Sequence, residues 1–133
     1  MIGIVIVAHG GLAREYLAAV EHVVGPQQGI RAITIEDDHD RAMKQAEIRA
    51  AADSVDAGDG VVVVTDMFGG SPSNLSLMAC EQCEREIIYG ANLPLLIKLA
   101  KSRSLGVHAA VEAALDAGRK YINSYSMCSP AVK

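Results

Sequence analysis

Residues 61–74 of this chain read VVVVTDMFGGSPSN, an apolar run that passes through a glycine-rich turn into a helix start. Four consecutive valines are typical of a strand that is buried on both faces of a parallel sheet. Beyond the turn, Ser71 is a favourable helix N-cap, and Pro72 suits the first helical position because its missing N–H needs no partner there. The stretch therefore predicts a buried strand, a tight turn and a helix, with Asp66 at the carboxyl end of the strand.

The start of the chain has the same pattern with a different side chain at the strand end. Ile2–Ala8 is an apolar run rich in β-branched residues, and His9 and two glycines follow it. Ligands of parallel α/β sheets gather at the carboxyl ends of the strands, so we expect His9 and Asp66 to meet at one edge. A carboxylate that binds one imidazole nitrogen fixes the tautomer and leaves the other nitrogen free to act as a nucleophile.

The turn after Asp66 adds an anion site to this pair. Gly69 and Gly70 allow the backbone to turn sharply and to approach a ligand closely. A glycine-rich turn before a helix presents free N–H groups and a partial positive charge, both of which favour a phosphate. Together with His9, these features predict a histidine that accepts a phosphoryl group.

The rest of the chain alternates between strand and helix patterns. The expected strands are Ile2–Ala8, Ile30–Ile35, Val61–Thr65 and Glu86–Tyr89. Five helices are expected between and after the strands. The first starts at Leu12, and the second follows a cap at Asp37, Asp38 or Asp40. The others start at Pro72 (to Gln82), at Pro94 and at Val107 (to about Gly118). This order predicts an α/β fold, a single three-layer domain over residues 1–133 with a mainly parallel four-stranded sheet flanked by helices.

Composition excludes several classes of protein. The chain has 133 residues, one Phe, no Trp and a formal net charge of −4. The acidic balance argues against nucleic-acid binding. The first apolar run is too short to span a membrane and lacks the basic region of an export signal, so we expect a cytoplasmic protein.

Cys80 and Cys83 have the spacing of redox and zinc motifs. They fall late in the helix expected over Pro72–Gln82, whereas a thiolate is stabilised at a helix N-terminus. No second cysteine pair completes a four-ligand zinc site. We therefore expect reduced thiols and no metal.

Three segments together resemble a known family. Residues 9–13 (HGGLA), 65–74 (TDMFGGSPSN) and 92–96 (NLPLL) are similar to motifs of the enzyme IIA component of the mannose family of the bacterial phosphoenolpyruvate:sugar phosphotransferase system. The resemblance keeps the order and spacing of all three segments and extends over nearly the whole chain. The DMFGGSPSN stretch is its most specific part.

The resemblance implies a phosphotransferase that works through a phosphohistidine at His9. Asp66 would be the partner of His9, and Ser71 would contact the phosphoryl group together with the backbone at Gly69 and Gly70. The phosphoryl donor would be the carrier protein HPr and the acceptor an enzyme IIB. No cofactor is expected, because the donor is already a phosphoprotein and phosphoryl transfer needs positioning more than covalent help.

Two other uses of the same chemistry stay open. Some members of the family carry a IIB domain on the same chain, whereas this sequence ends soon after its last expected helix, so we expect a separate IIB, through which the protein would reach a membrane permease. The chain would also suit a regulatory phosphoprotein that controls a partner without sugar transport, or the phosphotransfer subunit of a dihydroxyacetone kinase. The sugar is not encoded here, because a IIA component touches no sugar.

Two surfaces are expected to contact other proteins. Met67 and Phe68 are large apolar residues in a turn, which favours a docking role, although Phe68 would equally fill the core beneath the helix. The resemblance implies a homodimer that exchanges carboxy-terminal strands, and Tyr121–Cys128 is the candidate segment. Its polar residues leave the alternative of a tail that packs on its own subunit or is mobile.

Overall fold

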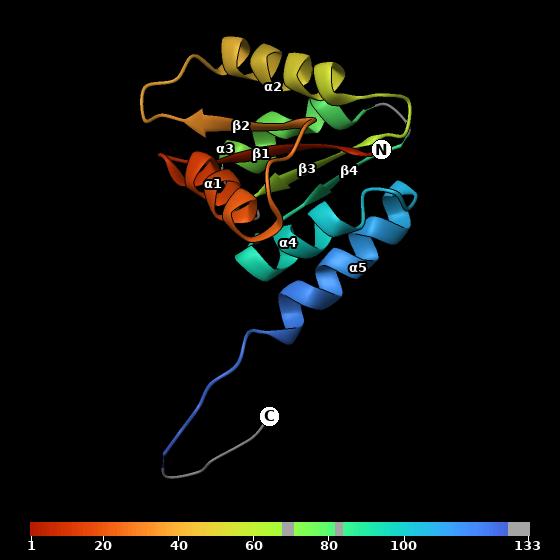
Figure 1. Cartoon of the computed structure of the whole chain (residues 1–133). Coiled ribbons are helices and arrows are strands. Elements are labelled where there is room, and N and C mark those ends of the chain that lie inside the picture. The colour runs from red at the N-terminus through yellow and green to blue at the C-terminus, as the bar shows by residue number, and fades with distance from the viewer. Residues whose placement is uncertain (68–70, 82–83, 128–133) are drawn as a thin grey trace.

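A parallel sheet forms the centre of the computed structural model, which describes residues 1–67, 71–81 and 84–127. Its strand order is β2-β1-β3-β4, and all neighbouring strands run parallel (Figure 1). The strands are β1 (Gly3–His9), β2 (Ile30–Ile35), β3 (Val61–Thr65) and β4 (Arg85–Ile88). The four strands expected from the sequence are thus confirmed to within a residue at each end.

The two central strands, β1 and β3, lead to the candidate site residues His9 and Asp66. Their register pairs Val7 of β1 with Thr65 of β3. Asp66 directly follows Thr65, the last residue of β3, and His9 is the last residue of β1. The pairing therefore brings both side chains to the same edge of the sheet, as predicted.

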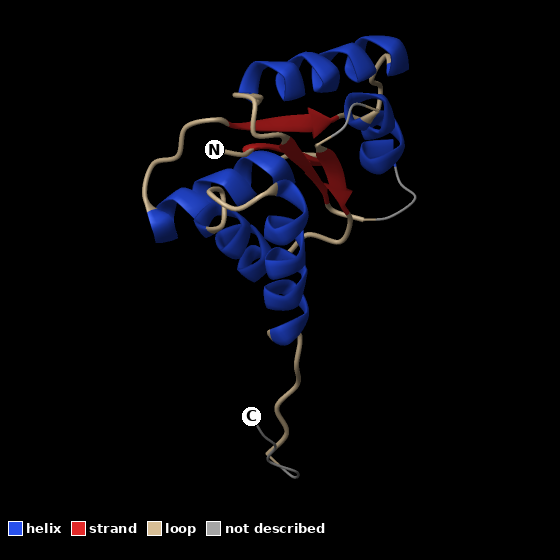
Figure 2. Cartoon of the chain, turned by 90° about the vertical axis from the view of Figure 1, so that its right-hand side faces the viewer, coloured by secondary structure: helices blue, strands red, loops and turns tan. Residues whose placement is uncertain are grey.

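Helices cover both faces of the sheet and make the fold three-layered (Figures 1 and 2). On one face Ile4, Ile6 and Ala8 of β1 join a core cluster with α1, α4 and α5. On the other face Val5 and Val7 join a cluster with α2 and the segment after β3. The elements on the first face are α1 (Leu12–Val24), α4 (Leu93–Lys101) and α5 (Val107–Lys120), and those on the second are α2 (Arg41–Val55), α3 (Ser71–Ser76) and the 3₁₀ turn η1 (Leu77–Cys80).

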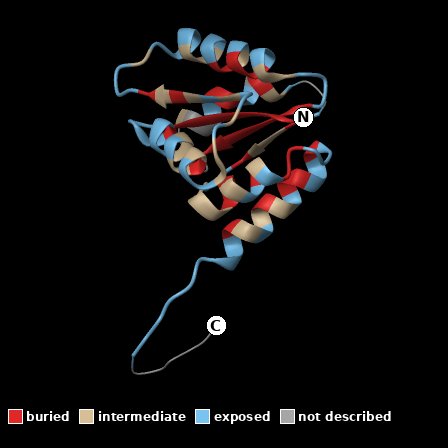
Figure 3. Cartoon of the chain, viewed as in Figure 1, coloured by how far each residue is buried: buried red, intermediate tan, exposed pale blue. Residues whose placement is uncertain are grey.

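Burial follows this layering. The buried residues lie along the strands and the sheet-facing sides of the helices, whereas the outer sides of the helices are exposed (Figure 3). Alternation along β1 sends its side chains to both clusters because successive residues of a strand point to opposite faces. No helix of the part of the chain described above is long and apolar enough to cross a membrane.

Local signals set the helix ends. The side chain of Asp40, one of the three expected caps, accepts a hydrogen bond from the backbone N–H of Met43 and starts α2. Gly25 ends α1 with a positive φ of 90°, a conformation that glycine adopts without a side-chain clash.

The helix expected over Pro72–Gln82 is wrong in its extent. The α-helix ends at Ser76 and continues only as the 3₁₀ turn to Cys80. Ser71 is the first helical residue and not the cap before it. Serine and asparagine are weak helix formers, and this segment (SPSNLS) is rich in them, so a short α-helix agrees with its composition.

The last helix also differs from its expected end. Gly118 lies inside α5, which runs on to Lys120. A Cβ at position 118 would come within 3.1 Å of the Cβ of Leu95, and the Asn92 amide donates to the Gly118 carbonyl at 3.0 Å. This glycine therefore permits close packing of α5 on α4, and it does not stop the helix.

Residues 121–127 leave the body of the protein after α5 and are exposed (Figures 1 and 3). They form no strand in the single chain, and Cys128 lies outside the described residues. Strand exchange in a dimer therefore stays a prediction.

Candidate functional site

His9 and Asp66 form one hydrogen-bonded unit at the carboxyl edge of β1 and β3. The Nδ1 atom of His9 lies 2.8 Å from Oδ2 of Asp66, and the backbone N–H of His9 donates to the same oxygen at 3.1 Å. The imidazole side chain is 49% exposed, whereas the carboxylate is only 11% exposed. A shielded carboxylate thus orients a ring that is open to solvent.

This geometry indicates which nitrogen of the His9 ring carries the proton. An ionised carboxylate can only accept hydrogen bonds, so Nδ1 of His9 carries the proton that lies between the two groups. The lone pair of the neutral ring is then on Nε2. An accessible imidazole with a free nitrogen and a carboxylate behind it is suited to nucleophilic attack.

The other oxygen of Asp66 is in a different situation. Its Oδ1 atom is buried and has no hydrogen-bond partner among the described residues. Burial first, and the negative charge of Asp66 second, raise the pKa of the Tyr16 phenol on α1. Sequence reasoning assigned Tyr16 only to the apolar pattern of its helix, because nothing in a sequence marks which backbone carbonyl a phenol reaches.

The structure places only some of the expected phosphate-binding and docking residues. Ser71 is partly buried at the start of α3, and Met67 is 54% exposed directly after Asp66. Phe68, Gly69 and Gly70 lie outside the described residues. The anion cradle therefore stays a prediction.

Exposed apolar side chains follow three of the four strands at this edge. Leu12 begins α1 just after β1, Met67 follows β3, and Tyr89 follows β4. Large apolar side chains that gather on an exposed edge are typical of protein-binding surfaces. We call Leu12, Met67 and Tyr89 the apolar rim.

Cys80 does not have the properties of a redox centre. Its thiol is free and partly buried, and burial raises its pKa to about 11. A reactive cysteine needs a lowered pKa, because the thiolate is the nucleophile. Cys83 lies outside the described residues, so the expected pair itself is not observed.

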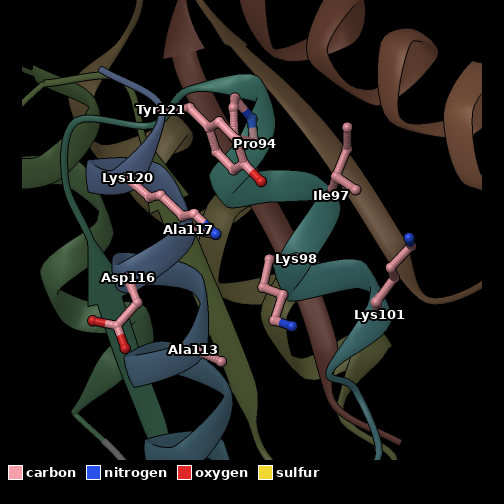
Figure 4. A pocket seen from close by; sticks show the side chains of 9 residues that line it. All are labelled: Pro94, Ile97, Lys98, Lys101, Ala113, Asp116, Ala117, Lys120 and Tyr121. Atoms are coloured by element: carbon pink, nitrogen blue, oxygen red, sulfur yellow. The ribbon is translucent and has the colours of Figure 1, made fainter. Parts of the chain in front are cut away.

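A groove of about 690 Å³ lies between α4 and α5 (Figure 4). Lysine side chains border it, and Pro94 and Tyr121 lie at one end. His9 and Asp66 are not among its lining residues. The groove is therefore separate from the candidate site.

Comparison with known proteins agrees with this arrangement. The family model EIIA-man, described as PTS system fructose IIA component, matches residues 3–117. The mannose-specific EIIAB component of the phosphotransferase system of Escherichia coli K12 is 27% identical over 126 residues, which are 92% of this chain and 39% of that protein. The chain thus spans about two-fifths of that relative.

A shorter relative and a solved structure are also similar over most of their length. YadI of Escherichia coli K12, which carries the name of a phosphotransferase enzyme IIA component, is 31% identical over 104 residues, 77% of this chain and 71% of that protein. The mannose/sorbose-specific IIA subunit from Enterococcus faecalis has the same fold, with a TM-score of 0.84 at 22% identity over 99% of this chain and 98% of the other. With the family model matching most of its length, this chain belongs to the EIIA-man family, the mannose-type IIA components of the phosphotransferase system.

Proposed function

We propose that this protein carries a phosphoryl group on Nε2 of His9, received from the phosphohistidine of HPr and passed to a separate enzyme IIB. Membership of the family supports a phosphotransfer role in the sugar phosphotransferase system. The observation that carries the finer proposal is the 2.8 Å contact between His9 and Asp66, which leaves Nε2 as the free nitrogen.

The transfer itself exchanges one nitrogen–phosphorus bond for another. The lone pair on Nε2 of His9 attacks the phosphorus, and the bond to the HPr histidine breaks with its electron pair. The His9 ring gains positive character as the new bond forms, and the adjacent carboxylate of Asp66 stabilises that charge. Neither a metal nor a redox partner enters this balance.

The phosphoryl oxygens need donors on the far side of the ring. We assign this role to Ser71 and to the backbone at Gly69 and Gly70, because phosphoryl transfer depends on positioning and on stabilising spread negative charge. Ser71 starts α3 directly after this turn, which is the place where N–H groups without helical partners are expected.

HPr and IIB dock on the edge that surrounds His9. The apolar rim of Leu12, Met67 and Tyr89 supplies exposed contact area there, and Phe68 would extend it. Apolar anchors beside a reactive group let a carrier bind its partners in turn without a deep pocket. The carrier would work in the cytoplasm and reach the permease through IIB.

We also propose a homodimer in which residues 121–128 contribute to the contact. Tyr121, Ile122, Tyr125 and Met127 are all strongly exposed in the single chain. Burying these side chains against a second copy removes apolar surface from water, and β2 and β4 are open edges that an added strand would cover.

The decisive test is reconstitution with phosphoenolpyruvate, enzyme I and HPr. The wild-type protein should gain one phosphate that is labile in acid and stable in base, and His9→Ala should gain none. His108→Ala, which removes another exposed histidine, is the control and should be labelled normally. Label retained by His9→Ala would refute the assignment.

Transfer onward separates the carrier from the alternatives. Labelled protein should lose its phosphate to a IIB of the mannose family. Retention with every IIB, together with phosphorylation-dependent binding of another protein, would favour the regulatory alternative. Transfer to another subunit of a dihydroxyacetone kinase would favour the alternative that this protein is the phosphotransfer subunit of such a kinase.

A further inference from the structure

The hydroxyl of Tyr16 connects two elements that flank the candidate site. Tyr16 lies on α1, the helix that follows His9, and its Oη atom donates to the carbonyl of Ala91 at 3.1 Å. Ala91 belongs to the loop between β4 and α4. The ring of Tyr16 is partly buried against the core on this face of the sheet. Its hydroxyl thus joins the helix after His9 to the loop after β4.

The loop passes this restraint on to Asp66. The backbone N–H of Ala91 donates to the carbonyl of Thr65 at 3.1 Å. That carbonyl is part of the peptide bond between Thr65 and Asp66. The Thr65 hydroxyl, which is fully buried, donates to the carbonyl of Ile88 at 3.3 Å. The backbone that carries Asp66 is therefore held to the loop by Ala91 and to β4 by Ile88.

The direction of the Asp66 carboxylate depends on that backbone. His9 uses only Oδ2, through its ring and its backbone N–H. Oδ1 is buried and has no hydrogen-bond partner in the part of the chain that the structure describes. The position of the Thr65–Asp66 peptide therefore contributes to the orientation of the carboxylate that faces His9.

The contacts close into a ring. The chain runs from His9 through α1 to Tyr16, hydrogen bonds continue through Ala91 and Thr65, and the carboxylate of Asp66 returns to His9. Loss of one hydroxyl would open this ring without removing any group that touches the imidazole.

We propose that Tyr16 is a positioning residue for phosphoryl transfer: its hydroxyl, acting through Ala91 and Thr65, holds Asp66 where it fixes the tautomer of His9. This inference rests on the proposed function of His9. It adds a residue whose hydroxyl binds Ala91 and not the imidazole, and which lies outside the motifs that define the site.

A Tyr16→Phe variant separates this role from simple packing. It keeps the ring and its apolar contacts and removes only the hydroxyl. Ser102→Ala is the matched control, because the Ser102 hydroxyl also donates to a backbone carbonyl, that of Lys98 at 2.7 Å. Ser102 follows α4 at its far end, next to Arg103, whose side chain binds the carbonyl of Ile2 before β1.

Transfer from phospho-HPr should fall about tenfold in kcat for Tyr16→Phe, with a KM for HPr within about twofold of wild type, since geometry and not docking is impaired. Nitrogen-15 NMR should show a new population of His9 with the proton on Nε2. Ser102→Ala should keep wild-type kinetics and a wild-type His9 spectrum. A Tyr16→Phe protein with wild-type kcat and spectrum would overturn the inference, even if it unfolds at a lower temperature.

Thr65→Val keeps the carbonyl that Ala91 binds but removes the hydroxyl that holds the same Thr65–Asp66 peptide to Ile88, and it serves as a second variant if Tyr16→Phe folds poorly. Loosening this peptide should also give a population of His9 with the proton on Nε2, and an unchanged spectrum would contradict the premise that the placement of the peptide sets the tautomer. The NMR readout needs no phosphoryl donor. Failure of wild-type protein to accept phosphate would therefore refute the proposed function, while the spectra still decide on Tyr16.

Discussion

His9 and Asp66 are 57 residues apart in the chain, yet their Nδ1 and Oδ2 atoms lie 2.8 Å from one another. The register of β1 and β3 produces this contact, because both residues stand at the carboxyl ends of paired central strands. The contact depends on the sheet as a whole, and substitutions of the pair should affect chemistry more than folding.

Asp66→Asn should slow phosphoryl transfer by at least about a hundredfold, because an amide can hold the ring in the wrong tautomer and carries no charge to stabilise it. The free energy of unfolding should change by about 1 kcal/mol or less, since the shape is kept. Rapid-quench transfer from phospho-HPr and urea unfolding would measure the two effects. Asp37→Asn, at an exposed turn, is the control, and equal transfer rates in both variants would contradict the assignment.

Met67→Ala should weaken binding of HPr about fivefold or more with little change in melting temperature, because the side chain is 54% exposed beside the site. Met43→Ala removes an exposed methionine from α2 and should leave binding unchanged. Titration calorimetry with HPr measures both variants. Equal affinities of the two variants would remove Met67 from the docking surface.

Phe68→Ala tests the two interpretations of Phe68. A docking residue loses HPr affinity and keeps its melting temperature. A core residue loses roughly 3–5 kcal/mol of stability when it is truncated to alanine. We expect the docking result, and a large fall in melting temperature would show that Phe68 fills the core.

Gly118→Ala should destabilise the protein by about 1 kcal/mol although alanine favours helices. The new Cβ would lie 3.1 Å from the Cβ of Leu95, and overpacking of this kind costs more than the helix propensity regained. Ala109→Gly at an exposed position of α5 reports the propensity alone in the same helix. Denaturant unfolding that shows Gly118→Ala to be more stable than wild type would contradict the packing argument.

A protein that ends at Lys120 should be monomeric, whereas the full-length chain should be a dimer. Light scattering after size-exclusion chromatography measures both masses. The shorter protein keeps all of α5, so its loss of mass would not reflect a damaged helix. A monomeric full-length protein would refute the dimer, and an unchanged dimer after truncation would exclude the tail from the contact.

The sequence predicted most of the fold because its apolar runs and glycines are local signals. The apolar runs Ile2–Ala8 and Val61–Thr65 predicted the two central strands. His9 and Asp66 directly follow these runs, which made them the candidate site residues. Their contact follows from a general property of parallel sheets, which is why it could be predicted without coordinates.

The parts that were missed depend on tertiary contacts. Gly118 has the sequence pattern of a helix stop, but its role is set by packing against α4, which no local pattern encodes.

 The contact that requires glycine at position 118 is the one with Leu95 on α4. Tyr16 reads as one more apolar helical position, whereas its hydroxyl reaches a carbonyl in a loop 75 residues away. The α-helix α3 ends at Ser76, in a segment whose serines and asparagine are weak helix formers although its pattern also allows a longer helix.

The pairing of β1 with β3 has a consequence for how the protein is made. His9 is synthesised early, whereas its partner Asp66 follows only after β2 and α2. The strands β1 and β3 therefore cannot pair before that point of synthesis. An amino-terminal fragment that stops short of Asp66 would present a histidine without its orienting group. Under the proposed function, competence for phosphoryl transfer would therefore arise only once the two central strands have come together.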